Sequence, residues 1–300
     1  MTSMSGKTVV VTGATNGLGE AIAQAVANMG ADTIIISRSE QKCKDTVAKI
    51  KQETGNQSVR YYVADLSAMA QVRDVAAQLN RDLDRLDVLV NNAGAWFTER
   101  KLSADGIEMT WALDHMSYFL LTHDLLDLLK RTAAEHGEAR IINQSSGAHH
   151  EGVLHRDNIQ FEGTWNTDGR GSFGPGWGAY SQAKYANVVH AKKLARLLAG
   201  TGVVANAVHP GVVVTGFSQN NGLMYRIAAP FRKLWNPAPV EGGAAPAVYL
   251  ASAPEAATIT GKYYGPPSKD EPCNPNADST EEQDWLWQHS LQLAGIAQPA

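Results

Sequence analysis

The sequence has little cysteine, no long apolar run and no large excess of charge of either sign. Its two cysteines, Cys43 and Cys273, lie far apart and in no metal-ligand spacing, which excludes a disulfide framework and a zinc site. The apolar run Val9-Val10-Val11 begins too close to Met1 to follow a secretory signal. No apolar segment approaches the roughly 18 to 20 residues of a membrane span. We therefore expect a cytoplasmic protein with reduced thiols, no bound metal and no membrane partner.

The near balance of charge also limits the possible partners. The formal net charge is -4 over 300 residues, so the chain lacks the basic surface that binds nucleic acid. With 44% hydrophobic and 19% charged residues, the chain can bury a sizeable core. We expect a globular protein that binds a small molecule and no nucleic acid.

Strand-like and helix-like stretches alternate from residue 7 to about residue 264 without a linker. This alternation predicts a doubly wound parallel β-sheet of about seven strands with helices on both faces, a Rossmann-type α/β fold. We expect a single domain over residues 1–300. The expected strands are 8–12, 33–37, 59–64, 87–90, 139–143, 203–208 and 259–264, and the expected helices are 17–29, 40–53, 70–83, 107–131, 179–199 and 242–250.

Two long segments interrupt the alternation. Residues 147–178 are rich in Gly, Asn, Asp and His, and residues 212–240 carry aromatic residues between prolines. Both follow expected strands, at the edge of the sheet where ligands bind, so we predict two substrate-site loops. A packed connection or a dimer contact is the alternative for the second segment. Residues 265–300 are expected to form a tail that ends in a short helix.

A glycine-rich turn, Thr12-Gly13-Ala14-Thr15-Asn16-Gly17-Leu18-Gly19, joins the first expected strand to the first expected helix. The unpaired N–H groups and the dipole of that helix favour a pyrophosphate, and the glycines let the backbone approach it closely. A structural turn without a ligand is the alternative, because the spacing differs from G-x-G-x-x-G. The predicted dinucleotide contacts are Gly13, Thr15, Asn16, Gly17, Leu18 and Gly19.

The residues at the end of the second expected strand determine whether NAD(H) or NADP(H) fits. An acidic side chain there would bond a free ribose 2′-hydroxyl, whereas a basic one receives a 2′-phosphate. The chain reads Ser37-Arg38-Ser39, with a guanidinium, two hydroxyls and no carboxylate. We therefore predict that NADP(H) is favoured over NAD(H). A solvated surface arginine is the alternative.

Tyr180, Lys184 and Ser146 are the candidate catalytic residues. Tyr180 and Lys184 are four residues apart on an expected helix and so share one face. An ammonium beside a phenol stabilises the phenolate and moves its pKa towards neutrality, which makes a usable acid and base. Ser146 follows the fifth expected strand, where a hydroxyl can donate to a carbonyl oxygen as charge develops on it. The spacing Y-x-x-x-K is common on helices, so by itself it is also compatible with a Tyr and a Lys on the protein surface that have no catalytic role.

These motifs together resemble the short-chain dehydrogenase/reductase family, in particular its retinol-dehydrogenase-like branch. The resemblance covers nearly the whole chain. It is carried by the glycine turn, Asn91-Asn92-Ala93-Gly94, Ser145-Ser146, Tyr180-Ser-Gln-Ala-Lys184, His209-Pro210-Gly211 and Gly261-Lys262-Tyr263-Tyr264.

The resemblance implies further roles. Asp65 would meet the adenine, Asn91 would lie beside the adenosine ribose, Lys184 would bond the nicotinamide ribose, and Thr215 would approach the carboxamide. Family members of this kind reduce or oxidise lipophilic aldehydes, ketones and alcohols, and often dimerise through the helix that carries the tyrosine. We thus expect a homo-oligomer, either a dimer or a tetramer. The resemblance adds these cofactor contacts: Leu66, Ala93, Gly94, Tyr180, Pro210, Gly211 and Val213.

One residue departs from the family pattern. Asp114, in Trp111-Ala-Leu-Asp114-His115, stands where the family usually has Asn, in a helix whose distorted backbone holds a water that links the active-site lysine to solvent. An Asp there either pairs with Lys184, retaining the proton relay or altering the pKa of Tyr180, or is an inactivating or engineered change. A catalytically weak dinucleotide-binding regulator or structural subunit is therefore the alternative function.

Five aromatic residues are candidates for an apolar substrate pocket. They follow the fourth expected strand or lie in the two predicted loops, and each is equally compatible with core packing. They are Trp96, Phe97, Trp177, Phe217 and Tyr225.

Overall fold

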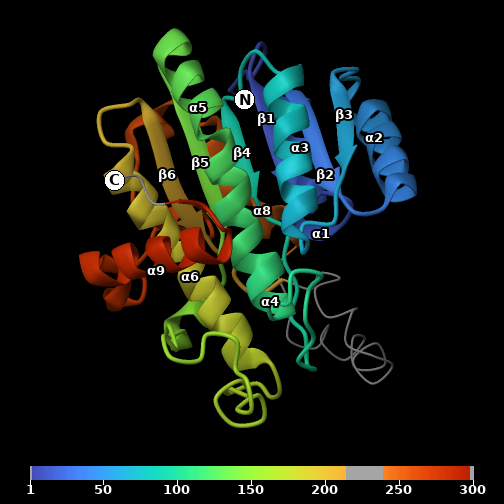
Figure 1. Cartoon of the computed structure of the whole chain (residues 1–300). Helices are drawn as coiled ribbons and strands as arrows, with labels where there is room; N and C mark the ends of the chain where they lie inside the picture. The colour runs from blue at the N-terminus through green and yellow to red at the C-terminus, as the bar shows by residue number, and fades with distance from the viewer. Residues whose placement is uncertain (1, 214–238, 298–300) are drawn as a thin grey trace.

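A mostly parallel sheet forms the centre of the computed structural model, which describes residues 2–213 and 239–297 (Figure 1). Within these residues the sheet has eight strands in the order β3-β2-β1-β4-β5-β6-β7-β8. The predicted single α/β domain is confirmed; the additional strand is β8, a two-residue antiparallel partner of β7. The strands are β1 (Thr8–Thr12), β2 (Asp32–Ser37), β3 (Val59–Val63), β4 (Val88–Asn91), β5 (Ala139–Gln144), β6 (Val203–Val208), β7 (Tyr263–Gly265) and β8 (Lys269–Asp270).

Helices cover both faces of the sheet because successive strand residues face opposite sides. On β1, Val9 and Val11 pack in one hydrophobic core, and Val10 packs in the other. Figure 1 shows α3 and α5 crossing the near face, with α1 and α8 behind. The longer helices are α1 (Gly17–Asn28), α2 (Glu40–Thr54), α3 (Met69–Asp82), α5 (Ser117–His136), α6 (Trp177–Leu197), α8 (Val240–Ser252) and α9 (Thr280–Leu293).

The strand order reverses between β1 and β4. The chain runs outward from β1 to the edge strand β3 and then returns to place β4 on the other side of β1. At such a switch point the connections from neighbouring strands leave in opposite directions, and a crevice opens at the carboxyl ends of the strands. The residues that follow β1, β2, β4, β5 and β6 therefore face one site.

The stretch predicted as helical over 107–131 is helical from Met109, and the distorted backbone that the family resemblance implies at Asp114 is present. A short helix α4 (Met109–Trp111) is followed by a π-helical turn η1 (Ala112–Met116) and then by α5. A π turn carries one more residue than an α turn, so apolar periodicity does not reveal it. As a result both Asp114 and His115 are fully buried.

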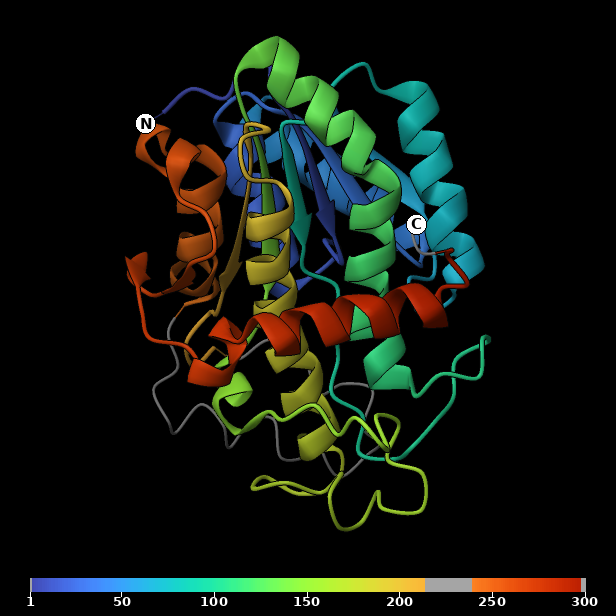
Figure 2. The ribbon, with the colours of Figure 1, turned by 60° about the vertical axis from the view of Figure 1, so that its left-hand side comes forward.

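The C-terminal helix α9 crosses the outer side of α5 and α6 (Figure 2). The Trp287 ring lies 5.0 Å from that of Phe119 on α5, and Lys193 of α6 pairs with Asp284 at 2.7 Å. α9 therefore occupies much of the outer face of the helix that carries Tyr180 and Lys184.

The predicted last strand, 259–264, is shorter than expected. β7 begins only at Tyr263, because the preceding segment is held by side chains instead of a sheet ladder: Asn206 Nδ2 donates to the Ile259 carbonyl at 2.6 Å, and Thr260 Oγ1 accepts from Ala205 N at 3.1 Å.

The described residues contain neither a membrane-spanning helix nor a cluster of metal ligands. None of the helices there combines the length and apolar character of a membrane span. No group of three or more His, Cys, Asp or Glu side chains in the same part of the chain is arranged to hold a metal ion.

Candidate active site

The three candidate catalytic side chains come together at the carboxyl edge of the sheet. α6 packs against β5 and against the 3-10 helix η2 (Gly147–Glu151), which follows Ser146. Tyr180 is 5% exposed, and a hydrogen bond links it to Ser146. The Lys184 ammonium lies 5.5 Å from the centre of the Tyr180 ring. Phenol, hydroxyl and ammonium thus share one site.

Local hydrogen bonds fix Ser146 and Lys184. The Ala148 N–H donates to Ser146 Oγ at 3.2 Å, so the Ser146 O–H remains available as a donor. The neighbouring Ser145 Oγ donates to the Lys184 carbonyl at 2.7 Å and ties α6 to the end of β5. Lys184 Nζ donates to the Gln144 carbonyl at 3.3 Å.

The π turn η1 places Asp114 against Lys184. Asp114 Oδ2 lies 2.9 Å from Lys184 Nζ, both side chains are almost fully buried, and Asp114 Oδ1 accepts from the Ala95 N–H at 2.9 Å. A Cβ on Gly94 would lie 2.7 Å from Asp114 Oδ2, so glycine is needed for this close approach. Burial raises the pKa of the Asp114 carboxyl, while the Lys184 ammonium acts in the opposite direction. Of the alternatives given for Asp114, the structure therefore shows the one in which it pairs with Lys184.

The expected lowering of the Tyr180 pKa by Lys184 is not found. Burial and the Asp114 carboxylate raise the pKa of Tyr180 above its ordinary value, and the hydrogen bond with Ser146 only partly opposes them. The main physical reason is burial, which removes the water that would stabilise a phenolate, and the Asp114 carboxylate adds to it and opposes the effect of the ammonium that it pairs with.

The predicted glycine turn has the shape of a cradle for a dinucleotide. Gly13 has a φ of +65°, and a Cβ there would lie 2.7 Å from Ala93 Cα. A Cβ on Gly19 would lie 2.6 Å from the Gly13 carbonyl oxygen, so both positions need glycine. Asn16 precedes α1 and makes no side-chain hydrogen bond to it. The turn therefore fits a pyrophosphate at the start of the helix.

The residues predicted to read the ribose lie beside this turn. Ser37 Oγ is 3.0 Å from Thr15 Oγ1. Arg38 is exposed and forms no ion pair within residues 2–213 and 239–297, whereas Ser39 Oγ caps α2 through Lys42 N at 3.4 Å. Asp65 Oδ1 is already engaged with the Ser67 N–H and hydroxyl, at 3.0 and 2.7 Å. Arg38 therefore presents an exposed guanidinium directly after β2.

The Asn91 side chain points into the interior of the sheet, and a place for this residue beside the adenosine ribose stays a prediction. Asn91 is fully buried, and its Nδ2 donates to Thr122 Oγ1 at 2.9 Å and to Asn143 Oδ1 at 3.0 Å. These bonds satisfy the amide nitrogen, whereas the buried Oδ1 has no hydrogen-bond partner among the described residues. A contact of this segment with a ribose would therefore use the backbone beyond β4.

Three other predicted cofactor contacts converge on α8. A Cβ on Gly243 would lie within 3.1 Å of the Val213 side chain, the Leu18 side chain and the Pro210 carbonyl oxygen.

The remaining predicted cofactor contacts lie in different places. Gly211 is exposed, with a φ of +67°. Leu66 is buried, shortly after the end of β3. Thr215 lies outside the described residues.

An aromatic wall borders Tyr180. The Trp177 ring centre lies 5.4 Å from those of Trp96 and Tyr180, and the exposed Phe173 lies 4.6 Å from Trp177. Phe97 is half-buried, and Phe217 and Tyr225, like most of the predicted loop 212–240, lie outside the described residues. Trp177, which falls in the predicted loop 147–178 but is the first residue of α6, therefore lies at the edge of the site.

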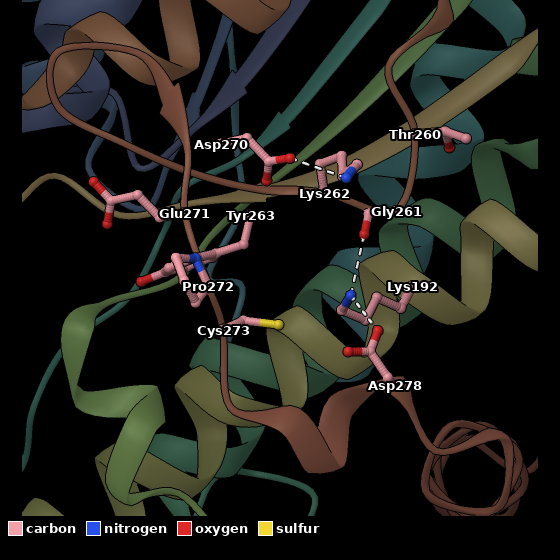
Figure 3. A pocket seen from close by; sticks show the side chains of 10 residues that line it. All are labelled: Lys192, Thr260, Gly261, Lys262, Tyr263, Asp270, Glu271, Pro272, Cys273 and Asp278. Atoms are coloured by element: carbon pink, nitrogen blue, oxygen red, sulfur yellow. Dashed lines mark hydrogen bonds and ion pairs between the residues drawn. The ribbon is translucent and has the colours of Figure 1, made fainter.

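An open hollow of about 560 Å³ lies elsewhere, between α6, β7 and the tail (Figure 3). Its charged side chains already pair: Lys192 with Asp278 at 2.6 Å and Lys262 with Asp270 at 2.9 Å. It contains none of the predicted site residues.

Two residues that contact the Ser146 turn were not predicted from the sequence. His149 Nδ1 lies 2.8 Å from the Ser146 carbonyl oxygen, and Asn274 in the tail contacts His149. The only sequence signal was the position of His149, three residues after Ser146. The distance of 125 residues to Asn274 gave no indication of contact.

Comparison with known proteins identifies relatives of this chain. The family profile described as short chain dehydrogenase matches residues 7–157. Retinol dehydrogenase 13 of Homo sapiens is 35% identical and aligns with 99% of this chain and 87% of its own length. Short-chain dehydrogenase TIC 32 A, chloroplastic, of Brassica napus is 36% identical over 95% of this chain and 88% of its own. The RhlG/NADP complex of Pseudomonas aeruginosa is similar in structure, with a TM-score of 0.69, 27% identity and coverage of 89% of this chain and 96% of that chain.

Proposed function

The chain belongs to the short-chain dehydrogenase family, and we propose that it uses NADPH to reduce lipophilic or aromatic aldehydes and ketones, with the reverse oxidation of the alcohols. Membership makes it an NAD(P)-dependent oxidoreductase that acts on CH–OH or C=O groups and resembles retinol dehydrogenases. The observation that carries the proposal is the cluster of Tyr180, Ser146 and Lys184, in which Tyr180 and Lys184 are buried, beside the wall of Trp96 and Trp177.

Each residue has a distinct part in the proposed reaction. When bound, the nicotinamide supplies the hydride. Ser146 donates to the carbonyl oxygen and stabilises the charge that develops on it, and Tyr180 transfers its proton to that oxygen. Because burial and Asp114 raise the pKa of Tyr180, the phenol is protonated near neutral pH, which suits the reducing direction.

Arg38 supports the proposed preference for NADPH, and its removal tests that preference. A charge-assisted hydrogen bond contributes roughly 1.5 to 3 kcal/mol, or about 10- to 100-fold in affinity. We expect Arg38→Ala to weaken NADPH binding by that factor and to leave NADH binding within about 2-fold, because NADH has no 2′-phosphate. Fluorescence titration with both cofactors measures the two dissociation constants. Equal weakening of both would show that Arg38 does not read the phosphate.

Asp114→Asn tests the coupling between Asp114, Lys184 and Tyr180. Asparagine keeps the shape but removes a charge that raises the Tyr180 pKa, so the pKa falls. In alcohol oxidation, where Tyr180 must be deprotonated, we expect the rise of kcat/KM with pH to move down by about one unit or more, with higher activity near neutrality. Asp74→Asn, which removes an exposed charge, is the control. Superimposable profiles for Asp114→Asn and the wild type would exclude the coupling.

A panel of carbonyl compounds tests the proposed substrate class. Turnover of NADPH with aromatic and long-chain aldehydes and ketones, and little turnover with short polar ones, is expected from the aromatic wall beside Tyr180. No turnover with any carbonyl, despite tight NADPH binding, would favour the alternative of a catalytically weak regulator or structural subunit, which the neutralised Lys184 makes plausible.

The proposed setting is a cytoplasmic homo-oligomer. α9 lies over the outer face of α6. If the dimer or tetramer forms through the α6 side of the molecule, we expect α9 to be part of the interface.

A further inference from the structure

The turn that carries Ser146 is held from two sides. On one side, Gly152 at the end of η2 lies so close to α6 that a Cβ there would clash with Tyr185 and with the Ser181 carbonyl oxygen. On the other side lies the C-terminal tail, which crosses Tyr263 through Glu271, Pro272 and Cys273 (Figure 3). Asn274 follows directly and is 7% exposed.

Asn274 bonds the end of η2 at several points. Its Nδ2 donates to the Gly152 carbonyl at 3.1 Å and to the carbonyls of His149 and His150 at 3.5 Å. Its backbone N–H donates to His149 Nε2 at 3.2 Å. One tail residue therefore satisfies carbonyl groups that the end of a short helix leaves without partners.

These contacts fix the tautomer of His149. A carbonyl oxygen only accepts, so His149 Nδ1 must donate to the Ser146 carbonyl at 2.8 Å, and His149 Nε2 must accept from Asn274. The side chain is completely buried, and burial lowers the pKa of His149 to about 4, which keeps the ring neutral at working pH. The backbone N–H of His149 also donates to the Ser146 carbonyl, at 3.0 Å.

We propose that His149 is a positioning residue for Ser146, and that Asn274 of the C-terminal tail holds the His149 ring in the orientation that this requires. Two donors on one carbonyl oxygen fix the peptide plane after Ser146 and hence the direction in which its Cβ and hydroxyl point. The proposal rests on the proposed function, in which that hydroxyl donates to the substrate oxygen. A hydroxyl displaced by a fraction of an ångström loses much of its effect on the developing charge.

Two substitutions of His149 separate its two contacts. The amide nitrogen of asparagine is as many bonds from Cβ as Nδ1, so His149→Asn keeps a donor for Ser146. The amide group of glutamine is as many bonds from Cβ as Nε2, so its oxygen in His149→Gln can still accept from the Asn274 N–H. This variant has no donor at the position of Nδ1, and the bond to the Ser146 carbonyl is lost. We expect His149→Gln to lower kcat about 10-fold or more, with the NADPH dissociation constant within about 2-fold, and His149→Asn to retain most of kcat.

Asn274→Ala should also lower kcat, but by less than His149→Gln does. Asn276→Ala, which alters an exposed tail side chain, should leave kcat unchanged.

In the Ser146→Ala background, His149→Gln should cause no further loss of kcat, because it acts through the missing hydroxyl. A further loss of equal size would overturn the proposal. So would wild-type kcat for both His149→Gln and Asn274→Ala while Ser146→Ala is impaired. Full activity of Ser146→Ala alone would instead refute the proposed function.

Discussion

Replacing Tyr180 with phenylalanine is expected to lower kcat by at least about 100-fold while leaving NADPH binding intact, because the substitution removes only the hydroxyl that transfers the proton. The ring is packed against Trp177 and retains those contacts in the variant. Steady-state kinetics with a carbonyl from the panel and a fluorescence titration with NADPH measure the two quantities.

The same substitution at Tyr185 is the matched control for Tyr180. Tyr185 also lies on α6, but its hydroxyl faces Glu282 of α9 at 3.4 Å. We expect Tyr185→Phe to leave kcat within about 2-fold of wild type, since a phenol remote from the reacting atoms adds nothing to proton transfer. Near-normal turnover of Tyr180→Phe would refute its role as the acid.

Ser146→Ala is expected to lower kcat by about 100- to 1000-fold, the scale observed when one donor to a developing oxyanion is removed. The substitution also removes the hydroxyl that accepts from Ala148, so thermal unfolding should be measured to show that the turn remains folded. Ser172→Ala, in the loop that follows, removes an exposed hydroxyl bonded to Glu151 and should leave kcat unchanged. Ser146→Ala with the kinetics of the wild type would make Ser146 a structural residue.

The arrangement of the sheet could be predicted because it follows from local patterns. β1, β2 and β6 are short runs of apolar, mostly β-branched residues, and the helices between the parallel strands show regular apolar spacing. The glycine turn was also recognisable, because its composition reflects close backbone contacts such as that of Gly13 with Ala93.

The apolar pattern did not reveal the π turn at Asp114, although the family resemblance implied a distorted helix backbone there. Its buried position depends on a pairing with Lys184 that is 70 residues distant in the chain, and an ion pair with α6 leaves no periodic signal around Asp114. The sequence showed that Asp114 departs from the family pattern, but only the geometry selected one of the alternatives.

The electrostatics of Tyr180 were mispredicted for a related reason. The spacing of Tyr180 and Lys184 shows that the ammonium is near, whereas the net effect on the phenol depends on burial and on Asp114. Burial is a property of the assembled fold, so a motif of two residues cannot supply it. The contact of Asn274 with His149 was missed because it joins the tail to the centre of the chain.

The transfer of a labelled hydride shows whether the site around Tyr180 supports direct reduction of a carbonyl by NADPH. NADPH carrying deuterium at both C4 positions is incubated with the best carbonyl substrate, and the alcohol product is analysed by mass spectrometry and NMR. If Tyr180, Ser146 and Lys184 support direct hydride transfer, each alcohol molecule carries one deuterium on the former carbonyl carbon, and the hydroxyl hydrogen comes from solvent. An alcohol without deuterium at that carbon, or oxidation of NADPH without formation of alcohol, would contradict the account.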